Sequence, residues 1–132
     1  MGVLTVKVIK ATNLADKDFV GKTDPYVEIT LEQDNMIRDK DYGMQKTSTK
    51  KGERNPVWDE EFTFNIPTLN NMELSLKVFD DDVGSRDDKC GKCKIHLEKE
   101  GLTRSPKRIE RTIDRNLLRK NGMLVVEISY SE

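Results

Sequence analysis

Residues 72–88 read Met-Glu-Leu-Ser-Leu-Lys-Val-Phe-Asp-Asp-Asp-Val-Gly-Ser-Arg-Asp-Asp, an alternating pattern that runs directly into an acidic segment. Apolar and polar side chains alternate over residues 72–78, which is the period of a half-buried β-strand. Five of the nine residues 80–88 are aspartates, whose carboxylates repel one another. A short loop with so many carboxylates needs a cation, and calcium takes about six to eight oxygen ligands. The stretch therefore predicts a strand followed by a calcium-binding loop.

The same alternation recurs along the rest of the chain. Its clearest runs are residues 4–8, 27–31, 62–66, 93–97 and 124–128. Two weaker runs, residues 45–49 and 109–113, bring the expected number of strands to about eight. Clusters of glycine, proline, asparagine and aspartate separate the runs. Many short strands with polar turns predict an all-β fold, an eight-stranded antiparallel Greek-key β-sandwich.

Length and composition limit the possible classes of protein. The 132 residues match one domain, residues 1–132, and a hydrophobic content of 35% is enough for one modest core. A formal net charge of −1 excludes a wholly basic nucleic-acid binder. No run approaches the roughly eighteen apolar residues of a membrane span, and we find no secretory signal. With only two cysteines, a reducing cytoplasm is the expected location.

Chain reversal brings a second acidic segment next to the first. If every connection reverses the chain, the first, third, fifth and seventh connections gather at one end of the sandwich. Residues 80–88 form the fifth connection, and the first carries Asp18 and Asp24. The two acidic loops should therefore meet, with residues 50–58 and 114–121 beside them and both termini at the opposite end.

The acidic loop has two other interpretations. A helix-flanked calcium loop is excluded because, counting from Asp80, position twelve is Gly91 instead of glutamate and position six is Ser85 instead of glycine. A solvated acidic turn that binds no metal remains as the alternative.

Four segments then carry a specific pattern: Asn-Leu-Ala-Asp-Lys-Asp at 13–18, Gly-Lys-Thr-Asp-Pro-Tyr-Val at 21–27, Asn-Pro-Val-Trp-Asp-Glu-Glu-Phe at 55–62 and Val-Phe-Asp-Asp-Asp at 78–82. Jointly they resemble the C2 domain, a calcium- and phospholipid-binding β-sandwich, and the resemblance covers nearly every residue. Because the first strand leads straight into the first acidic loop, the chain is similar to the circularly permuted type II arrangement. A small stand-alone C2-domain protein and a piece of a larger protein both fit the sequence.

The resemblance implies a set of calcium ligands. These are the carboxylates of Asp18, Asp24, Asp80, Asp82 and Asp88, the auxiliary Ser85, and the main-chain carbonyls of Lys17, Asp81 and Arg86. It implies two bound calcium ions, with a third when lipid is present. The side chain of Asp81 matches no ligand position in the family.

Membrane contacts follow from the same resemblance. Phe19, Val20 and Val83 lie at the loop tips that enter the headgroup region, although Phe19 has the alternative of packing against the sandwich. The basic residues that overlap the family's phosphoinositide-binding face are Lys46, Lys50, Lys51 and Arg54. A solvated strand face is the alternative for this basic group.

We therefore expect calcium-dependent binding to anionic phospholipid membranes that contain phosphatidylserine or phosphoinositides. The protein would move from the cytoplasm to the membrane surface when calcium rises. The alternative is a calcium-regulated protein-interaction adaptor that binds a protein partner and no lipid. We expect no enzyme and no catalytic residue. Metal-assisted hydrolysis needs a positioned base and a leaving-group acid, and neither is visible in the sequence.

Two cysteines and one histidine need a separate explanation. Cys90 and Cys93 have the spacing of a zinc or redox half-site. Residues three apart in a regular strand point to opposite faces, so we expect both cysteines to be packing residues. His96 alternates with apolar neighbours and should face outward.

Overall fold

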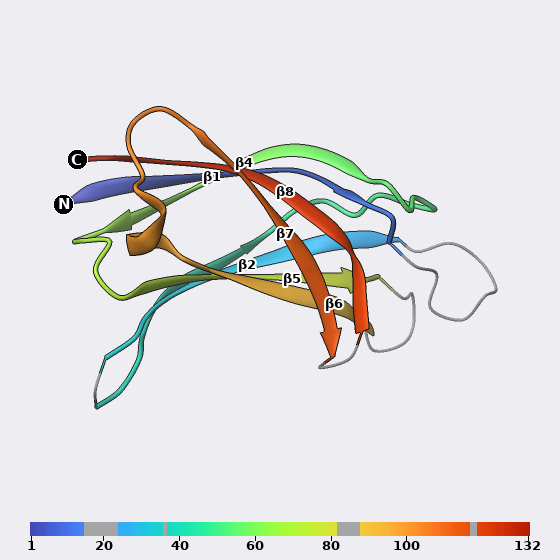
Figure 1. Cartoon of the computed structure of the whole chain (residues 1–132), viewed down its shortest axis with the longest axis horizontal. Coiled ribbons are helices and arrows are strands. Elements are labelled where there is room, and N and C mark those ends of the chain that lie inside the picture. Colours follow the sequence, from blue (N-terminus) through green and yellow to red (C-terminus); the bar gives the residue numbers. More distant parts are fainter. Residues whose placement is uncertain (15–23, 36, 82–87, 117–118) are drawn as a thin grey trace.

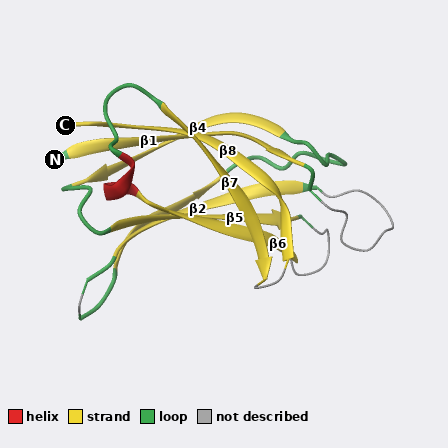
Figure 2. Cartoon of the chain, viewed as in Figure 1, coloured by secondary structure: helices red, strands yellow, loops and turns green. Residues whose placement is uncertain are grey.

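A computed structural model describes residues 1–14, 24–35, 37–81, 88–116 and 119–132. Among these residues, eight strands and one short 3-10 helix are formed: β1 (Gly2–Thr12), β2 (Pro25–Gln33), β3 (Lys40–Lys46), β4 (Val57–Ile66), β5 (Met72–Asp80), β6 (Asp88–His96), η1 (Leu97–Glu100), β7 (Lys107–Asn116) and β8 (Arg119–Ser131). Figure 2 shows the strands in yellow and η1 in red. The predicted all-β fold is confirmed. No helix in the described part of the chain has the length and apolar character needed to cross a membrane.

The strands form two antiparallel layers, as Figure 1 shows. The hydrogen-bonded order is β3-β2-β5-β6-β7-β8-β1-β4, but only the pair Lys92 and Asp114 joins β6 to β7. The sheet therefore folds there into a layer of β3, β2, β5 and β6 and a layer of β7, β8, β1 and β4. At the other edge, Gln45 Nε2 of β3 donates to Thr63 O of β4 at 2.9 Å. The two edge strands β3 and β4 are thus joined by a side-chain contact.

The core lies between the layers and is built by the period-two alternation. In β5, Met72, Leu74, Leu76 and Val78 are buried, while the residues between them are partly exposed. The largest fully buried side chains are Leu4, Leu14, Ile29, Leu31, Ile66, Met72, Leu74, Leu76, Ile95, Leu97, Ile113 and Leu124. Burying a side chain of this size stabilises the fold by about 1.5–3 kcal/mol. The apolar interior therefore holds the layers together and leaves polar chemistry to the strand ends.

The predicted gathering of connections at one end is confirmed for the described residues. Pro25, where β2 begins, pairs with Asp80, where β5 ends, and Gly52 of the third connection contacts Asp24. The termini lie together at the opposite end, where Val3 pairs with Ser131 (Figure 1). The two residues between β7 and β8 lie outside the described residues.

The predicted third strand was misplaced. We expected it at residues 45–49, whereas β3 spans Lys40–Lys46. An irregularity in the β2–β3 register, between Thr30 and Glu32, breaks the alternation, and every residue of β3 is at least partly exposed. An edge strand with so little apolar surface gives no periodic signal in the sequence.

The prediction that Cys90 and Cys93 point to opposite faces is wrong. Both are buried in the core, with exposures of 5% and 7%. The reason is a β-bulge, because Phe79 pairs with Lys89 while Val78 pairs with Gly91, which leaves Cys90 as an extra residue. Asn121 Nδ2 donates to the Cys90 carbonyl at 3.1 Å. Their role as packing residues is consistent with this burial.

The buried thiol of Cys93 predicts a loss of stability at high pH. Burial raises the pKa of Cys93 to about 12 from its usual 9.0; the Arg111 charge opposes this rise and the Asp114 charge adds to it. Above pH 9 the thiol ionises in the unfolded chain and stays protonated in the folded one, so folding loses stability as pH rises toward 12. Through this group, the free energy of unfolding should fall by up to about 1.4 kcal/mol per pH unit.

Urea unfolding of the wild type and of Cys93→Ala at a series of pH values measures this effect. Other groups titrate equally in both proteins, so the difference between the two slopes isolates the thiol. Identical slopes above pH 9 would contradict the prediction.

Candidate functional site

The candidate site begins where β2 and β5 meet at the calcium end predicted from the sequence. The Asp24 backbone N–H donates to Asp80 Oδ1 at 2.9 Å, and the Asp81 N–H donates to the Asp24 carbonyl at 2.9 Å. On the other side of β5, Asp80 pairs with Asp88 of β6. Three of the five predicted ligand positions therefore lie at the adjacent ends of neighbouring strands: Asp24 directly before β2, Asp80 at the end of β5 and Asp88 at the start of β6.

The third connection, residues 47–56, supports these acidic residues from the side. The Gly52 N–H donates to Asp24 Oδ1 at 2.7 Å, and Thr49 Oγ1 donates to Asp81 Oδ2 at 3.0 Å. The Lys50 N–H donates to the Pro25 carbonyl at 3.0 Å. Sequence reasoning did not find Thr49 or Gly52, because a main-chain donor and a lone hydroxyl carry no motif.

Asp80 and Asp81 have different side-chain contacts. Asp80 Oδ1 accepts a hydrogen bond from the Asp24 N–H, whereas Asp81 Oδ2 accepts one from Thr49 Oγ1. One position before Asp80, the Phe79 ring stacks on the Tyr26 ring with centroids 5.5 Å apart. The Asp81 carboxylate is thus bonded to the third connection, and the Asp80 carboxylate is bonded to the residue that precedes β2.

The donor set fits a hard cation such as calcium. Carboxylate oxygens are the ligands that calcium prefers, and a backbone N–H holds Oδ1 of both Asp24 and Asp80 in place. Within the described ranges, no three His, Cys, Asp or Glu side chains are arranged to hold a metal ion. Asp24 and Asp80 are therefore the described part of a candidate site that needs further ligands.

Eight of the predicted site residues lie outside the described part of the chain: Lys17, Asp18, Phe19, Val20, Asp82, Val83, Ser85 and Arg86. For Asp88 only the strand position is described.

The predicted basic residues lie at the same end of the sandwich. Lys46 Nζ is 5.6 Å from the Tyr26 ring centroid, and Lys50 and Lys51 directly precede Gly52, which contacts Asp24. Arg54 Nε donates to the Leu14 carbonyl at 3.1 Å, so Arg54 also anchors the start of the first connection. The sequence had suggested a lipid contact or a solvated strand face for Arg54, and neither includes this anchoring role.

The buried indole of Trp58 anchors the third connection to the core. Its side chain is 5% exposed, and its Nε1 donates to the Ser48 carbonyl at 3.0 Å. The indole therefore combines burial in the core with a polar contact to the loop that holds Asp24.

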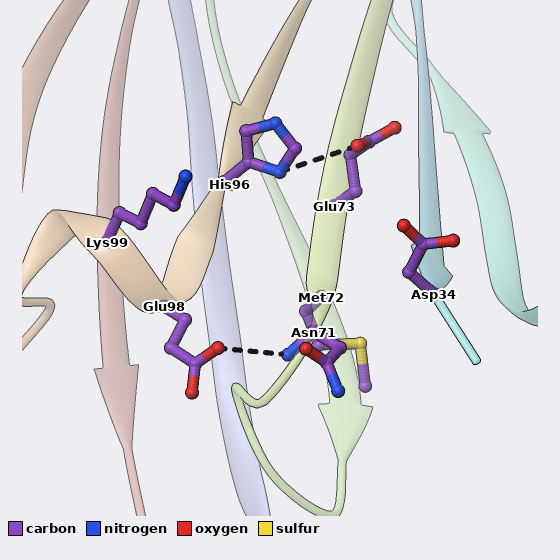
Figure 3. A pocket seen from close by; sticks show the side chains of 7 residues that line it. All are labelled: Asp34, Asn71, Met72, Glu73, His96, Glu98 and Lys99. Carbon is purple, nitrogen blue, oxygen red and sulfur yellow. Dashed lines mark hydrogen bonds and ion pairs between the residues drawn. The ribbon is translucent and has the colours of Figure 1, made fainter. Parts of the chain in front are cut away.

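A hollow at the opposite end has a different character (Figure 3). Its volume is about 110 Å³. It is lined by Met72 and by polar residues that include Glu73, His96 and Glu98. His96 Nδ1 lies 3.5 Å from Glu73 Oε2, and the His96 side chain is 58% exposed, which confirms that it faces outward. The full length of β5 separates this hollow from Asp80, so it is not part of the candidate site.

Carboxylates also crowd together beside this hollow. A hydrogen bond to the Asp39 side chain and its negative charge raise the pKa of Asp34, which is fully exposed. The crowding therefore occurs at the solvent-facing hairpin between β2 and β3.

A two-layer antiparallel sandwich whose acidic connections meet at one end is the architecture of a C2 domain. The C2 domain family matches residues 2–113, so the chain belongs to this family. It is 35% identical to Synaptotagmin-2 of Arabidopsis thaliana over 137 residues, which cover 98% of this chain and 24% of that protein. It is 38% identical to human Synaptotagmin-10 over 105 residues, which cover 78% of this chain and 19% of that protein. The chain thus spans about a quarter or less of the length of these relatives.

Solved structures show the same likeness. A C2 domain of plant Extended Synaptotagmin 1 superposes with a TM-score of 0.83 at 32% identity, covering 98% of this chain and 94% of that one. A calcium-bound pair of C2 domains from Extended-Synaptotagmin 2 gives a TM-score of 0.71 at 27% identity, covering 98% of this chain and 45% of that one. The first alignment is nearly end to end, so the fold corresponds along the whole chain.

The Asp24–Asp80 contact predicts different effects for two substitutions of Asp80. Asp80→Ala removes the acceptor of the Asp24 N–H and should cost about 1–2 kcal/mol of unfolding free energy. Asp80→Asn keeps an oxygen acceptor and removes a charge from a crowded acidic site, so its metal-free stability should stay within about 0.5 kcal/mol of wild type or exceed it. Urea unfolding in the presence of a chelator measures both. Equal losses for the two variants would contradict the role of the hydrogen bond.

Proposed function

We propose that this C2 domain binds anionic phospholipid membranes in a calcium-dependent manner and recruits the protein from the cytosol to the membrane. The observation that carries the proposal is the meeting of Asp24 and Asp80, which are separated by 56 positions in sequence. Family membership and the calcium-bound state of one structural neighbour support the same function. The domain acts in this proposal as a binding module and not as an enzyme.

The proposed ligand set extends the described pair. It comprises the side chains of Asp18, Asp24, Asp80, Asp82, Asp88 and Ser85 and the carbonyls of Lys17, Asp81 and Arg86. We propose two calcium ions, with a third in the presence of lipid. Bound calcium would supply positive charge and open coordination positions for lipid phosphate or carboxylate.

The negative charge of the acidic loop is the basis of the proposed calcium dependence. From Asp80 to Asp88 five carboxylates oppose one guanidinium, a net charge of −4 that should repel an anionic bilayer. Compensation of this charge would remove the repulsion and let the loop tips approach the headgroups. The Gly52 N–H orients the Asp24 carboxylate and the Asp24 N–H orients the Asp80 carboxylate before any ion arrives. Little reorganisation should therefore be needed on binding.

Further lipid contacts belong to the same proposal. Phe19, Val20 and Val83 are the proposed insertion residues, and burying a phenylalanine contributes about 2 kcal/mol. Lys46, Lys50, Lys51 and Arg54 form the proposed basic face for phosphatidylserine or phosphoinositide headgroups. Lys50 and Lys51 adjoin Gly52, which contacts Asp24, so lipid on this face would lie next to the acidic site.

Sedimentation with phosphatidylserine vesicles tests the membrane function. Wild-type protein should pellet with calcium and remain in solution with chelator. Asp80→Asn combined with Asp82→Asn should abolish pelleting, because the site loses two ligand charges. Asp39→Asn combined with Asp41→Asn changes the net charge equally at the opposite end and should pellet like wild type. Absence of wild-type pelleting on every anionic lipid, together with calcium binding in solution, would favour the protein-interaction adaptor.

The basic face predicts a separate loss of affinity. Lys50→Ala combined with Lys51→Ala should weaken binding to phosphoinositide vesicles about tenfold or more, since each lysine near the surface contributes about 1 kcal/mol. Calcium affinity without lipid should change little, because both side chains are absent from the proposed ligand set. The matched control is Arg38→Ala combined with Lys99→Ala, which removes two charges at the far end. Equal weakening by the control would show that only net charge matters.

A further inference from the structure

Asp81 lies between two proposed ligands, Asp80 and Asp82, yet its side chain has a different partner. Thr49 Oγ1 donates to Asp81 Oδ2 at 3.0 Å, and both groups are partly buried. The Asp81 N–H donates to the Asp24 carbonyl. Main chain and side chain of Asp81 are therefore both held by groups outside its own strand.

Thr49 is itself held firmly from several sides. On one side, the Lys50 N–H donates to the Pro25 carbonyl at 3.0 Å. On the other, the Ser48 carbonyl accepts a hydrogen bond from Trp58 Nε1, and the Thr47 N–H donates to the Val27 carbonyl at 2.9 Å. The main chain that carries Thr49 is therefore held in place, and the hydroxyl donates to Asp81 from this position.

Holding Asp81 in this way has an electrostatic consequence. Asp24 and Asp80 already place two carboxylates close together, since the N–H of one residue bonds the carboxylate of the other. A third carboxylate turned toward them would add like-charge repulsion. The bond to Thr49 instead gives that carboxylate a partner on the third connection.

We propose that Thr49 is a positioning residue of the acidic site: its hydroxyl holds the Asp81 side chain out of the ion pocket and fixes the main chain that follows Asp80. The inference rests on the proposed calcium function, and it explains physically why the middle aspartate of the Asp80-Asp81-Asp82 run offers no side-chain ligand. Thr49 is not in the proposed ligand set and acts through Asp81.

The first test uses metal-free protein. Three-bond couplings from Cγ of Asp81 to its backbone nitrogen and carbonyl carbon report the χ1 rotamer. Wild type and Thr49→Ser, which keeps the hydroxyl, should show one rotamer, whereas Thr49→Val should show averaging over several. Thr30→Val, the same substitution on the outer face of β2, is the control and should match wild type. A single Asp81 rotamer in Thr49→Val would overturn the proposal.

The second test measures calcium affinity by calorimetry. Thr49→Val should weaken binding about threefold to tenfold, because it removes the hydrogen bond that fixes Asp81, whose carbonyl is a proposed ligand. In an Asp81→Asn background, where that hydrogen bond is neutral and weaker, the same substitution should cost about threefold less. Independent, multiplicative effects of the two substitutions would overturn the proposal.

The outcomes separate this inference from the proposed function. If wild-type protein bound no calcium, the proposed function would fail, while the couplings in metal-free protein would still decide whether Thr49 positions Asp81. If wild type bound calcium and Thr49→Val kept both its affinity and its Asp81 rotamer, only the positioning role would fail. Thermal unfolding of all variants confirms that each is folded before comparison.

Discussion

The hydrogen bond from the Asp24 N–H to the Asp80 carboxylate is the interaction on which the acidic end of this protein depends. It exists because β2 and β5 pair in a continuous register from Pro25–Asp80 to Gln33–Met72. A carboxylate that accepts a backbone N–H has part of its charge compensated without a cation. The fold can therefore place acidic residues side by side before any metal is present.

Register irregularities help this sheet to fold into two layers. Near Val8, β1 shifts register against both β4 and β8, and β5 shifts against β6 at Val78. Next to the second shift, a Cβ on Gly91 would lie 2.6 Å from Ile113 Cγ2, so only glycine allows β6 and β7 to approach. Bulges bend strands and increase twist, which lets an edge cross from one layer to the other. The same bulge turns Cys90 toward the core beside Cys93.

The two ends of the sandwich differ in chemistry. At one end, main-chain donors and the Thr49 hydroxyl contact the acidic residues Asp24, Asp80 and Asp81. At the other end, Glu73 lies beside basic side chains, with Lys94 Nζ 3.2 Å from Glu73 Oε1, and the crowded pair Asp34 and Asp39 is exposed to solvent. Carboxylates bound by fixed N–H groups remain negative and oriented, whereas a side-chain pair neutralises its own charge. This difference explains why the first end is the candidate cation site although acidic residues occur at both.

The sequence by itself determined the layered β fold, the burial of alternate residues such as Leu74 and Leu76, and the convergence of Asp24 with Asp80. These properties depend on periods and chain reversals, which local patterns encode. Only the tertiary structure decided the bounds of β3, the shared face of Cys90 and Cys93, and the roles of Thr49, Gly52 and Arg54. Each of these depends on a bulge or on a hydrogen bond between distant segments, and a main-chain N–H or a single hydroxyl leaves no pattern in the sequence that would reveal its partner.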